Sequence, residues 1–153
     1  KTSRRKGFTL VEIMVVVTLI GLLTVSAVPL FQRIKLRAVS ATFVSDMRLI
    51  EEAFQRYAQE YGEFPRTAGV GVVPTGMEEY IDAERWAGAT TLGGNYRWLG
   101  EDQYSVVMIV GSTISMREMQ LIDEWIDDGN TNSGNLIVAG AGTVVYYILE
   151  LRT

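Results

Sequence analysis

The sequence predicts an α+β fold, in which one long N-terminal helix packs its second half on a small antiparallel sheet of three or four strands. Two observations support this prediction. The first is an apolar run from Phe8 to Val28, 21 residues with Glu12 as the only charge, followed by a helical stripe that reaches Tyr61. The second is a set of short β-branched and aromatic runs between glycines, all beyond residue 90.

The first half of the predicted helix has the length and composition of a membrane span. At about 1.5 Å of rise per residue, the run covers about 30 Å, the thickness of a bilayer core. Four cations stand among residues 1–7, and no charge except Glu12 appears before Arg33. This asymmetry predicts a single pass with the basic flank in the cytoplasm. A secretory signal cleaved near residues 25–27 is the alternative, but Glu12 and the continuing helical pattern count against it.

The second half of the helix is amphipathic, with apolar residues three or four positions apart. Pro29 removes one backbone hydrogen bond, which predicts a kink or a local loosening. Gly62 and Pro65 end the pattern, so a helix from Phe8 to Tyr61 would extend about 80 Å. The stripe consists of Leu36, Val39, Phe43, Met47, Ile50, Phe54, Tyr57 and Tyr61.

The remaining residues predict short elements that cover this stripe. Ser115 and Glu118 form a capping-box pattern at the start of one helix, and glycines at 140 and 142 mark a hairpin. A tight turn is expected at residues 100–102. The predicted elements are a short helix Met77–Trp86, a strand Asn95–Leu99, a strand Tyr104–Val110, a helix Met116–Asp127, and strands Leu136–Ala139 and Thr143–Leu151.

Glu12 is the unusual residue of the apolar run. A carboxylate inside a membrane span costs a few kcal/mol, and the run holds no cation to pair with it. In one interpretation Glu12 is a tolerated polar residue that snorkels to the interface. In the other, a cut between Gly7 and Phe8 creates an α-amine at the start of the helix, and the amine of a neighbouring copy pairs with Glu12.

The stretch from Arg5 to Glu12 resembles the processing site of type IV pilins and type II secretion pseudopilins. The resemblance implies that a prepilin peptidase cuts after Gly7 and N-methylates Phe8. It implies that Glu12 neutralises the terminal amine of the adjacent subunit, and Pro29 matches the proline that commonly follows the apolar run. A pilin-like fold is expected, with residues 1–7 as leader, 8–29 as transmembrane and assembly helix, and 30–153 as periplasmic globular domain.

The function implied by this resemblance is that of a structural subunit of a pilus-like filament, first of all a type II secretion pseudopilus. A type IV pilus or DNA-uptake pilin is the close alternative. The implied partners are other copies or related pseudopilins, in a homo- or hetero-oligomeric filament, and the prepilin peptidase. The implied location is the bacterial inner membrane, with the C-terminal domain in the periplasm and assembly into a periplasmic pseudopilus or surface filament. The absence of cysteine departs from many type IV pilins and favours a pseudopilin.

Composition excludes several other classes of function. Beyond the basic start, 18 acids face 10 cations, which argues against nucleic acid as a partner. The sequence has no histidine and no cysteine, so the usual zinc sites and cysteine or histidine catalysis are excluded. The rival from another class is a membrane-anchored periplasmic enzyme or binding domain. No nucleophile–base set supports it, so no enzyme is predicted.

The segment 127–135 is rich in side chains with oxygen atoms that could bind a metal. In the family that this sequence resembles, some major pseudopilins bind calcium in a C-terminal loop. Asp127, Asp128 and Asn130 would be the first ligands. Their spacing does not fit an EF-hand, and exposed turns use the same residues. We therefore expect no cofactor and little dependence on calcium. Asp123 and Glu124 are expected to lie with Asp127 and Asp128 at a solvated helix end.

The aromatic residues of the C-terminal half are expected to fill the core between sheet and helix. A platform for a sugar or peptide is the alternative. The residues concerned are Trp86, Tyr96, Trp98, Tyr104, Tyr146 and Tyr147.

Overall fold

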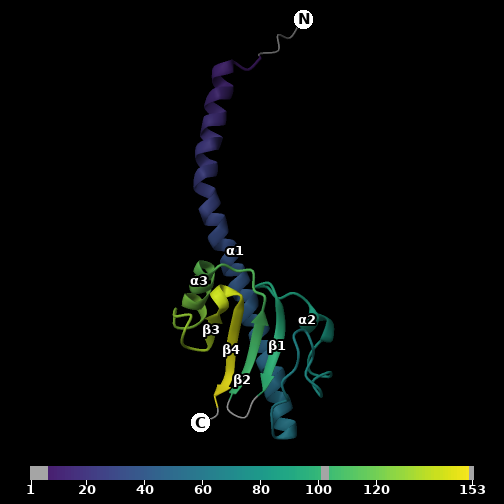
Figure 1. Cartoon of the computed structure of the whole chain (residues 1–153). Coiled ribbons are helices and arrows are strands. Elements are labelled where there is room, and N and C mark those ends of the chain that lie inside the picture. Colours follow the sequence, from purple (N-terminus) through teal and green to yellow (C-terminus); the bar gives the residue numbers. More distant parts are fainter. Residues whose placement is uncertain (1–6, 101–103, 152–153) are drawn as a thin grey trace, which may run out of the picture. The chain divides into compact units, whose positions relative to one another are not determined.

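The computed structural model describes residues 7–100 and 104–151, with no account of the side chains at 26, 27, 29, 150 and 151 (Figure 1). Its contacts divide the chain into two compact units, Lys1–Lys35 (unit 1) and Leu36–Thr153 (unit 2). The borders predicted for the leader and for the membrane-spanning segment depend on cleavage by a peptidase and on the bilayer, so they stay predictions. Most of the turn predicted at 100–102 lies outside the described residues.

Helix α1 comprises Leu10–Tyr61 and contributes to both units. It begins two residues later than predicted, because Thr9 takes the capping position. It ends as predicted at Gly62, whose φ of 81° lies in the left-handed region and whose N–H donates to the carbonyl of Ala58 at 2.8 Å. The helix continues through Pro29, so this residue does not interrupt it.

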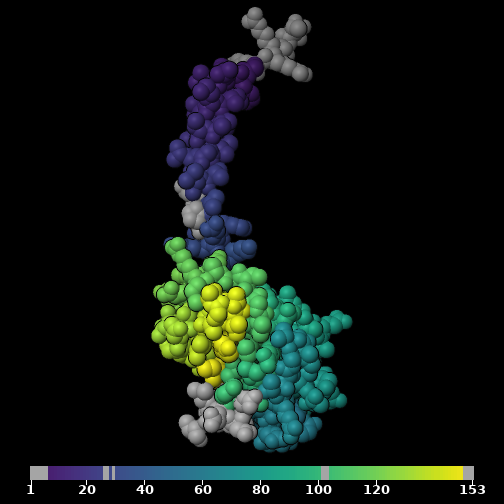
Figure 2. Space-filling model, viewed as in Figure 1, coloured from purple at the N-terminus to yellow at the C-terminus, as the bar shows by residue number. Residues whose placement is uncertain are grey.

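In unit 1, residues 8–28 carry no charge except Glu12, and the described side chains form no core of this unit. Every described side chain of residues 7–35 is exposed, and in Figure 2 these side chains stand along a single helix with no second layer of this unit over them. The hydroxyls of Thr18 and Thr24 donate to carbonyls of the preceding turn, which satisfies them without water. Within the described residues, α1 is the one helix long and apolar enough to cross a membrane.

Unit 2 contains one four-stranded antiparallel sheet with the order β1-β2-β4-β3. Two hairpin-type pairs, β1 with β2 and β3 with β4, are joined by the central β2–β4 pairing. The register sets Trp98 opposite Val107, and Val107 opposite Tyr147. The strands are β1 Asn95–Gly100, β2 Tyr104–Val110, β3 Leu136–Ala139 and β4 Val144–Leu151.

Loops cover both edges of this sheet. The amides of Ala68 and Gly71 donate to the carbonyls of Trp98 and Tyr96 in β1, at 3.1 and 2.7 Å. At the opposite edge, the amide of Val138 in β3 donates to the carbonyl of Thr131 at 2.8 Å. Backbone groups that would otherwise template another strand are therefore used within the chain.

The core of unit 2 lies between the sheet and the second half of α1 (Figure 1). Phe54 stacks on Trp98 with ring centroids 3.9 Å apart, and Trp86 stacks on Tyr96 at 5.2 Å. Leu36, Phe43, Met47 and Phe54 of the amphipathic stripe are buried as predicted, and Val39, Ile50 and Tyr57 are partly buried. Tyr61, at the end of the stripe, is exposed. The stripe therefore identifies most of the helix face that packs against the sheet.

The six aromatic residues predicted for the core have three different environments. Trp86, Tyr96 and Trp98 are buried, as predicted. Tyr146 and Tyr147 are only partly buried. Tyr104 is exposed, so its prediction was wrong: it opens β2 next to residues 101–103, at the start of the strand.

The two short helices differ from the predictions at their ends. Helix α2 is Ala83–Ala87, shorter than predicted, because Asp82 has extended backbone and caps a new helix by accepting from the amide of Arg85 at 3.0 Å. Helix α3 is Met116–Ile126 and begins with the predicted capping box between Ser115 and Glu118. It ends one residue early, because Asp127 has a non-helical backbone. A 3-10 turn, η1 Gly140–Gly142, joins β3 to β4.

Candidate processing and assembly site

Gly7 and Phe8 lie just outside the first helix. Both have irregular backbone and are exposed, and the Phe8 side chain is 83% accessible to solvent. A peptide bond in such a segment can enter a peptidase site without unwinding a helix. The geometry therefore suits the expected cut after Gly7, which itself stays a prediction.

Thr9 and Glu12 form a reciprocal cap at the start of α1. The backbone N–H and the hydroxyl of Thr9 both donate to Oε2 of Glu12, each at 2.8 Å. In return, the amide of Glu12 donates to the Thr9 hydroxyl at 3.3 Å. This is the capping-box arrangement. Sequence reasoning missed it, although Thr9-x-x-Glu12 follows the same rule that located Ser115 and Glu118.

The cap leaves the Glu12 carboxylate able to bind a further donor. Both bonds from Thr9 end on Oε2, so they do not use Oε1, and the side chain is exposed. A carboxylate in the first turn is also favoured by the positive end of the helix dipole. A protonated amine bound to Oε1 would form a charge-assisted hydrogen bond, which is about twice as strong as a neutral one.

Pro29 does not join this site. It lies 17 positions further along α1, which corresponds to about 25 Å of helix. Its backbone belongs to the helix, and its expected part in assembly stays a prediction.

A second candidate site lies at the end of α3, where Asp123, Asp127 and Asp128 each bring one carboxylate oxygen within 4.8 Å of the others. The expectation of a solvated helix end was wrong for Asp123, which is fully buried. Neither of its carboxylate oxygens has a hydrogen-bond partner among the described residues. The signal was available, because Asp123 lies four residues after Met119 and so continues the apolar stripe of this helix.

The other two carboxylates organise the loop that follows. Oδ2 of Asp127 accepts from the amides of Asn135 and Leu136, at 2.6 and 2.9 Å. Asp128 accepts from the amide of Asn130 at 2.8 Å and from the hydroxyl of Ser133 at 2.7 Å.

Gly134 and Asn130 complete this loop. Gly134 passes so close to Asp127 that any Cβ would overlap the carboxylate, which explains a glycine there. Oδ1 of Asn130 accepts from the amide of Asn132 at 3.3 Å, so this oxygen also shapes the turn.

The pKa values of Asp123 and Asp128 shift in opposite directions. Burial raises the pKa of Asp123 to about 6, and the negative charges of Asp127 and Asp128 add to the rise. The hydroxyl of Ser133 and the amide of Asn130 lower the pKa of Asp128. Three carboxylates with two unpartnered buried oxygens fit a hard divalent cation such as calcium, which prefers oxygen ligands.

Comparisons with known proteins concern the N-terminal sequence motif and the fold. A family model described as the prokaryotic N-terminal methylation motif matches residues 2–28. The type II secretion system core protein G of Escherichia coli (strain K12) is 34% identical over 82 residues, which are 54% of this chain and 52% of that protein. The protein of the same name from Klebsiella pneumoniae is 38% identical over 65 residues, 42% of this chain and 46% of that protein.

The chain thus matches only about half the length of these curated relatives. Among solved structures, the major type IV pilin PilA1 from Clostridium difficile matches with a TM-score of 0.52. The match covers 74% of this chain and 96% of the pilin, and at 18% identity it concerns the fold alone. The chain thus carries an N-terminal methylation motif over residues 2–28, is similar over about half its length to type II secretion system core protein G, and has a pilin-like α+β fold.

Proposed function

We propose that this chain is a subunit of a helical filament, the pseudopilus of a type II secretion system. One observation carries the proposal: every described side chain of residues 7–35 is exposed, although residues 8–28 carry no charge except Glu12. Such a surface is stable only against lipid or against other proteins. A pseudopilin meets both conditions in turn, since it waits in the membrane and then joins a bundle of identical helices.

In this proposal the chain is anchored once in the inner membrane, with unit 2 in the periplasm. A prepilin peptidase cuts after Gly7 and methylates the amine of Phe8. The subunit is the substrate of this enzyme and catalyses nothing itself, in keeping with a sequence that has no histidine or cysteine. Its partners in the filament are other copies or related pseudopilins.

The first experiment is an intact-mass measurement on protein extracted from its native membrane. The expected mass is that of a chain that begins at Phe8 and carries one added methyl group. A chain beginning at residues 26–28 would instead indicate ordinary secretion and would refute the proposal. The fraction of secreted protein and the number of sheared filaments should both fall to zero when the gene is deleted and return when it is restored.

The role of Glu12 is tested by two substitutions that separate charge from helix capping. Glu12→Gln keeps the capping box, because glutamine also serves at this position, but it removes the charge that would meet a neighbour's amine. Processing should persist and filaments should be lost. Glu12→Asp keeps the charge on a side chain one methylene shorter, and filaments should be reduced rather than lost. Wild-type filament numbers with Glu12→Gln would show that the charge does not direct assembly.

We also propose that Asp123, Asp127 and Asp128 hold a calcium ion that orders the loop 127–135. This proposal departs from the expectation drawn from the sequence, because that expectation did not include Asp123. A buried carboxylate without a donor is costly, and a divalent cation offsets that cost without a change of fold.

A further inference from the structure

Unit 2 has a small apolar pocket between α1, residues 80–82, α2 and β1. Its volume is about 120 Å³, and its apolar wall consists of Leu49, Ile50, Ala53, Ile81 and Trp86. Pockets for small-molecule ligands usually measure about 300 to 1,000 Å³, so this one has the size for a single side chain. Leu49 is half exposed at its border, so the wall is open to an approaching protein.

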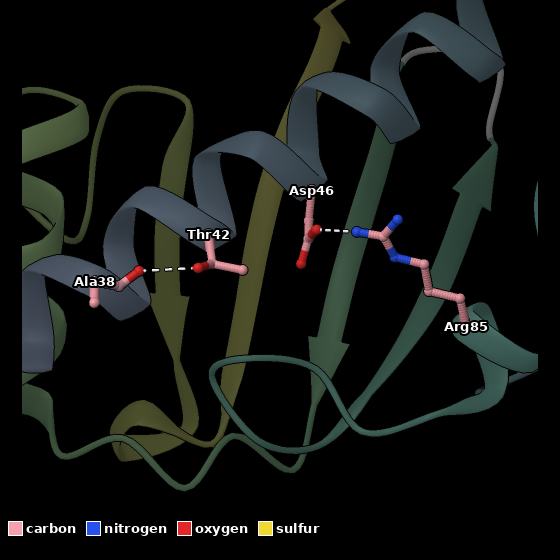
Figure 3. A network of polar contacts seen from close by, with 4 residues as sticks. All are labelled: Ala38, Thr42, Asp46 and Arg85. Atoms are coloured by element: carbon pink, nitrogen blue, oxygen red, sulfur yellow. Dashed lines mark hydrogen bonds and ion pairs between the residues drawn. The ribbon is translucent and has the colours of Figure 1, made fainter.

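The polar border of this pocket carries an excess of negative charge. Asp46 on α1 forms an ion pair with Arg85 on α2 through its Oδ1 atom (Figure 3). Asp46 is nearly buried, whereas most of the Arg85 side chain is exposed. Asp82 adds a second carboxylate, whose Oδ1 accepts from the amide of Arg85. The border thus carries two carboxylates and one guanidinium, and the Asp46–Arg85 pair uses Oδ1 of Asp46 but not its Oδ2.

The chain itself carries a segment with the complementary character. In unit 1, Phe31 and Ile34 are 70% and 57% exposed, large values for apolar side chains. Arg33 and Lys35 stand on either side of Ile34 and are exposed. No acidic residue occurs from residue 13 to residue 45, so nothing nearby in the sequence neutralises these cations.

We propose that the pocket of one copy receives Ile34 of a second copy, with Arg33 and Lys35 of that copy facing Asp46 and Asp82. Burial of Ile34 stabilises the contact, and the opposite charges fix its register. The contact joins two different surfaces, so it can repeat from copy to copy in an open filament. It rests on the proposed function, which supplies the second copy, and it adds a specific contact between unit 2 and a neighbouring helix.

Cysteine pairs test this contact directly, because the sequence has no cysteine of its own. One copy carries Leu49→Cys, and a second copy with an added epitope tag carries Ile34→Cys. Both are full-length and are expressed together in the native host, and the membranes and sheared filaments are then oxidised. A disulfide needs Cα atoms within about 7 Å, so a dimer of mixed mass reports close contact between copies.

A matched control uses Gln55→Cys in place of Leu49→Cys. Gln55 lies on the same helix and is exposed, but it does not line the pocket. We expect a mixed dimer when Leu49→Cys is paired with Ile34→Cys, and no mixed dimer when Gln55→Cys is paired with Ile34→Cys. Adding Lys35→Glu to the tagged copy should also remove the dimer, whereas Lys35→Arg should keep it.

The outcomes distinguish this contact from the proposed function. Filaments from the wild-type chain without a mixed dimer in the cysteine pair overturn the contact and leave the filament proposal standing. A dimer that is equally strong with the control pair or with Lys35→Glu also overturns it. A dimer formed only between two Leu49→Cys copies would mean that the pocket faces another pocket. The absence of wild-type filaments overturns the proposed function itself.

Discussion

The two halves of α1 have opposite environments, although the first half is the more apolar of the two. In unit 1, Leu22 and Leu23 are 72% and 71% exposed, and no described side chain before Leu36 is buried. In unit 2, Phe43 and Phe54 on the same helix are fully buried. The second half alternates apolar and charged residues with helical period, whereas the first half carries no charge on any side from Ile13 to Gln32. Burial therefore follows the pattern of apolar residues rather than their number.

This difference shows where each half obtains its stability. The second half is covered by strands of its own chain, which is the usual fate of an amphipathic helix. The first half would bury its surface only against molecules outside the chain, as a helix that is apolar all round does in a membrane or a bundle. Substitutions in unit 2 should therefore change folding, and those in unit 1 should change insertion or assembly.

The largest effect is expected for Phe54→Ala. The ring stacks on Trp98 and lies 6.0 Å from Trp86, so its removal leaves a cavity in the core. We expect a loss of about 3–5 kcal/mol in the free energy of unfolding. The measurement is denaturant unfolding of the full chain in detergent, followed by tryptophan fluorescence. All three tryptophans lie in unit 2, so the signal reports this unit.

Leu22→Ala is the matched substitution in unit 1. Its effect on the same unfolding curve should be close to zero, because Leu22 contacts no core in its own chain. Equal destabilisation by the two substitutions would contradict the division of α1 into a self-covered and an uncovered half.

The next effect concerns calcium and Asp123. Calcium at a hundredfold excess over its dissociation constant should stabilise unit 2 by about 2.7 kcal/mol, and chelator should reverse this. Asp123→Asn should remove most of the response, since it takes one charge from the three carboxylates. Glu124→Gln, a neighbouring change outside this group, should keep it. The measurement is a thermal melt with millimolar calcium or chelator, and an unchanged midpoint would favour the metal-free loop.

With chelator present, the same carboxyl group makes stability depend on pH. The pKa of Asp123 is about 6 in the folded chain, against about 3.9 for an unfolded aspartate, so the folded state binds more protons between these values. The contribution of Asp123 to stability is therefore fully present below about pH 4 and is lost as the pH rises through about 6. Asp123→Asn should flatten this part of the profile.

Local sequence patterns predicted where the strands and helices of unit 2 begin and end better than they predicted which strands pair. The bounds of β2 and β3 follow from β-branched residues and flanking glycines, and α3 begins at its capping box. The pairing of β2 with β4 joins segments separated by α3 and β3, and no local signal marks it. The candidate site shows the same limit. Gly7 to Glu12 are recognisable as a continuous motif in the sequence. The residues that lie near Asp123 in space depend instead on how α3 packs.

A smaller effect is expected for the cap of α3. Ser115→Ala removes the hydroxyl that accepts from the amide of Glu118 at 3.3 Å and donates to its carboxylate at 2.6 Å. The expected loss is about 1 kcal/mol in the free energy of unfolding, measured by the same fluorescence curve. Ser115→Asp should restore most of it, because aspartate also caps helices. No loss with alanine would mean that tertiary packing alone holds the start of α3.

The smallest effect is expected for the ion pair between Asp46 and Arg85. Arg85 is 63% exposed, so solvent screens the pair, although the Asp46 side chain is only 11% exposed. A double-mutant cycle with Asp46→Asn and Arg85→Gln should give a coupling energy below about 1 kcal/mol in the free energy of unfolding. The pair would then contribute little to the fold of unit 2, and its charges would remain available to set the register of a neighbouring copy. A coupling of about 3 kcal/mol or more would mean that the pair is a structural element of unit 2, and that the negative border of the pocket is held mainly for stability.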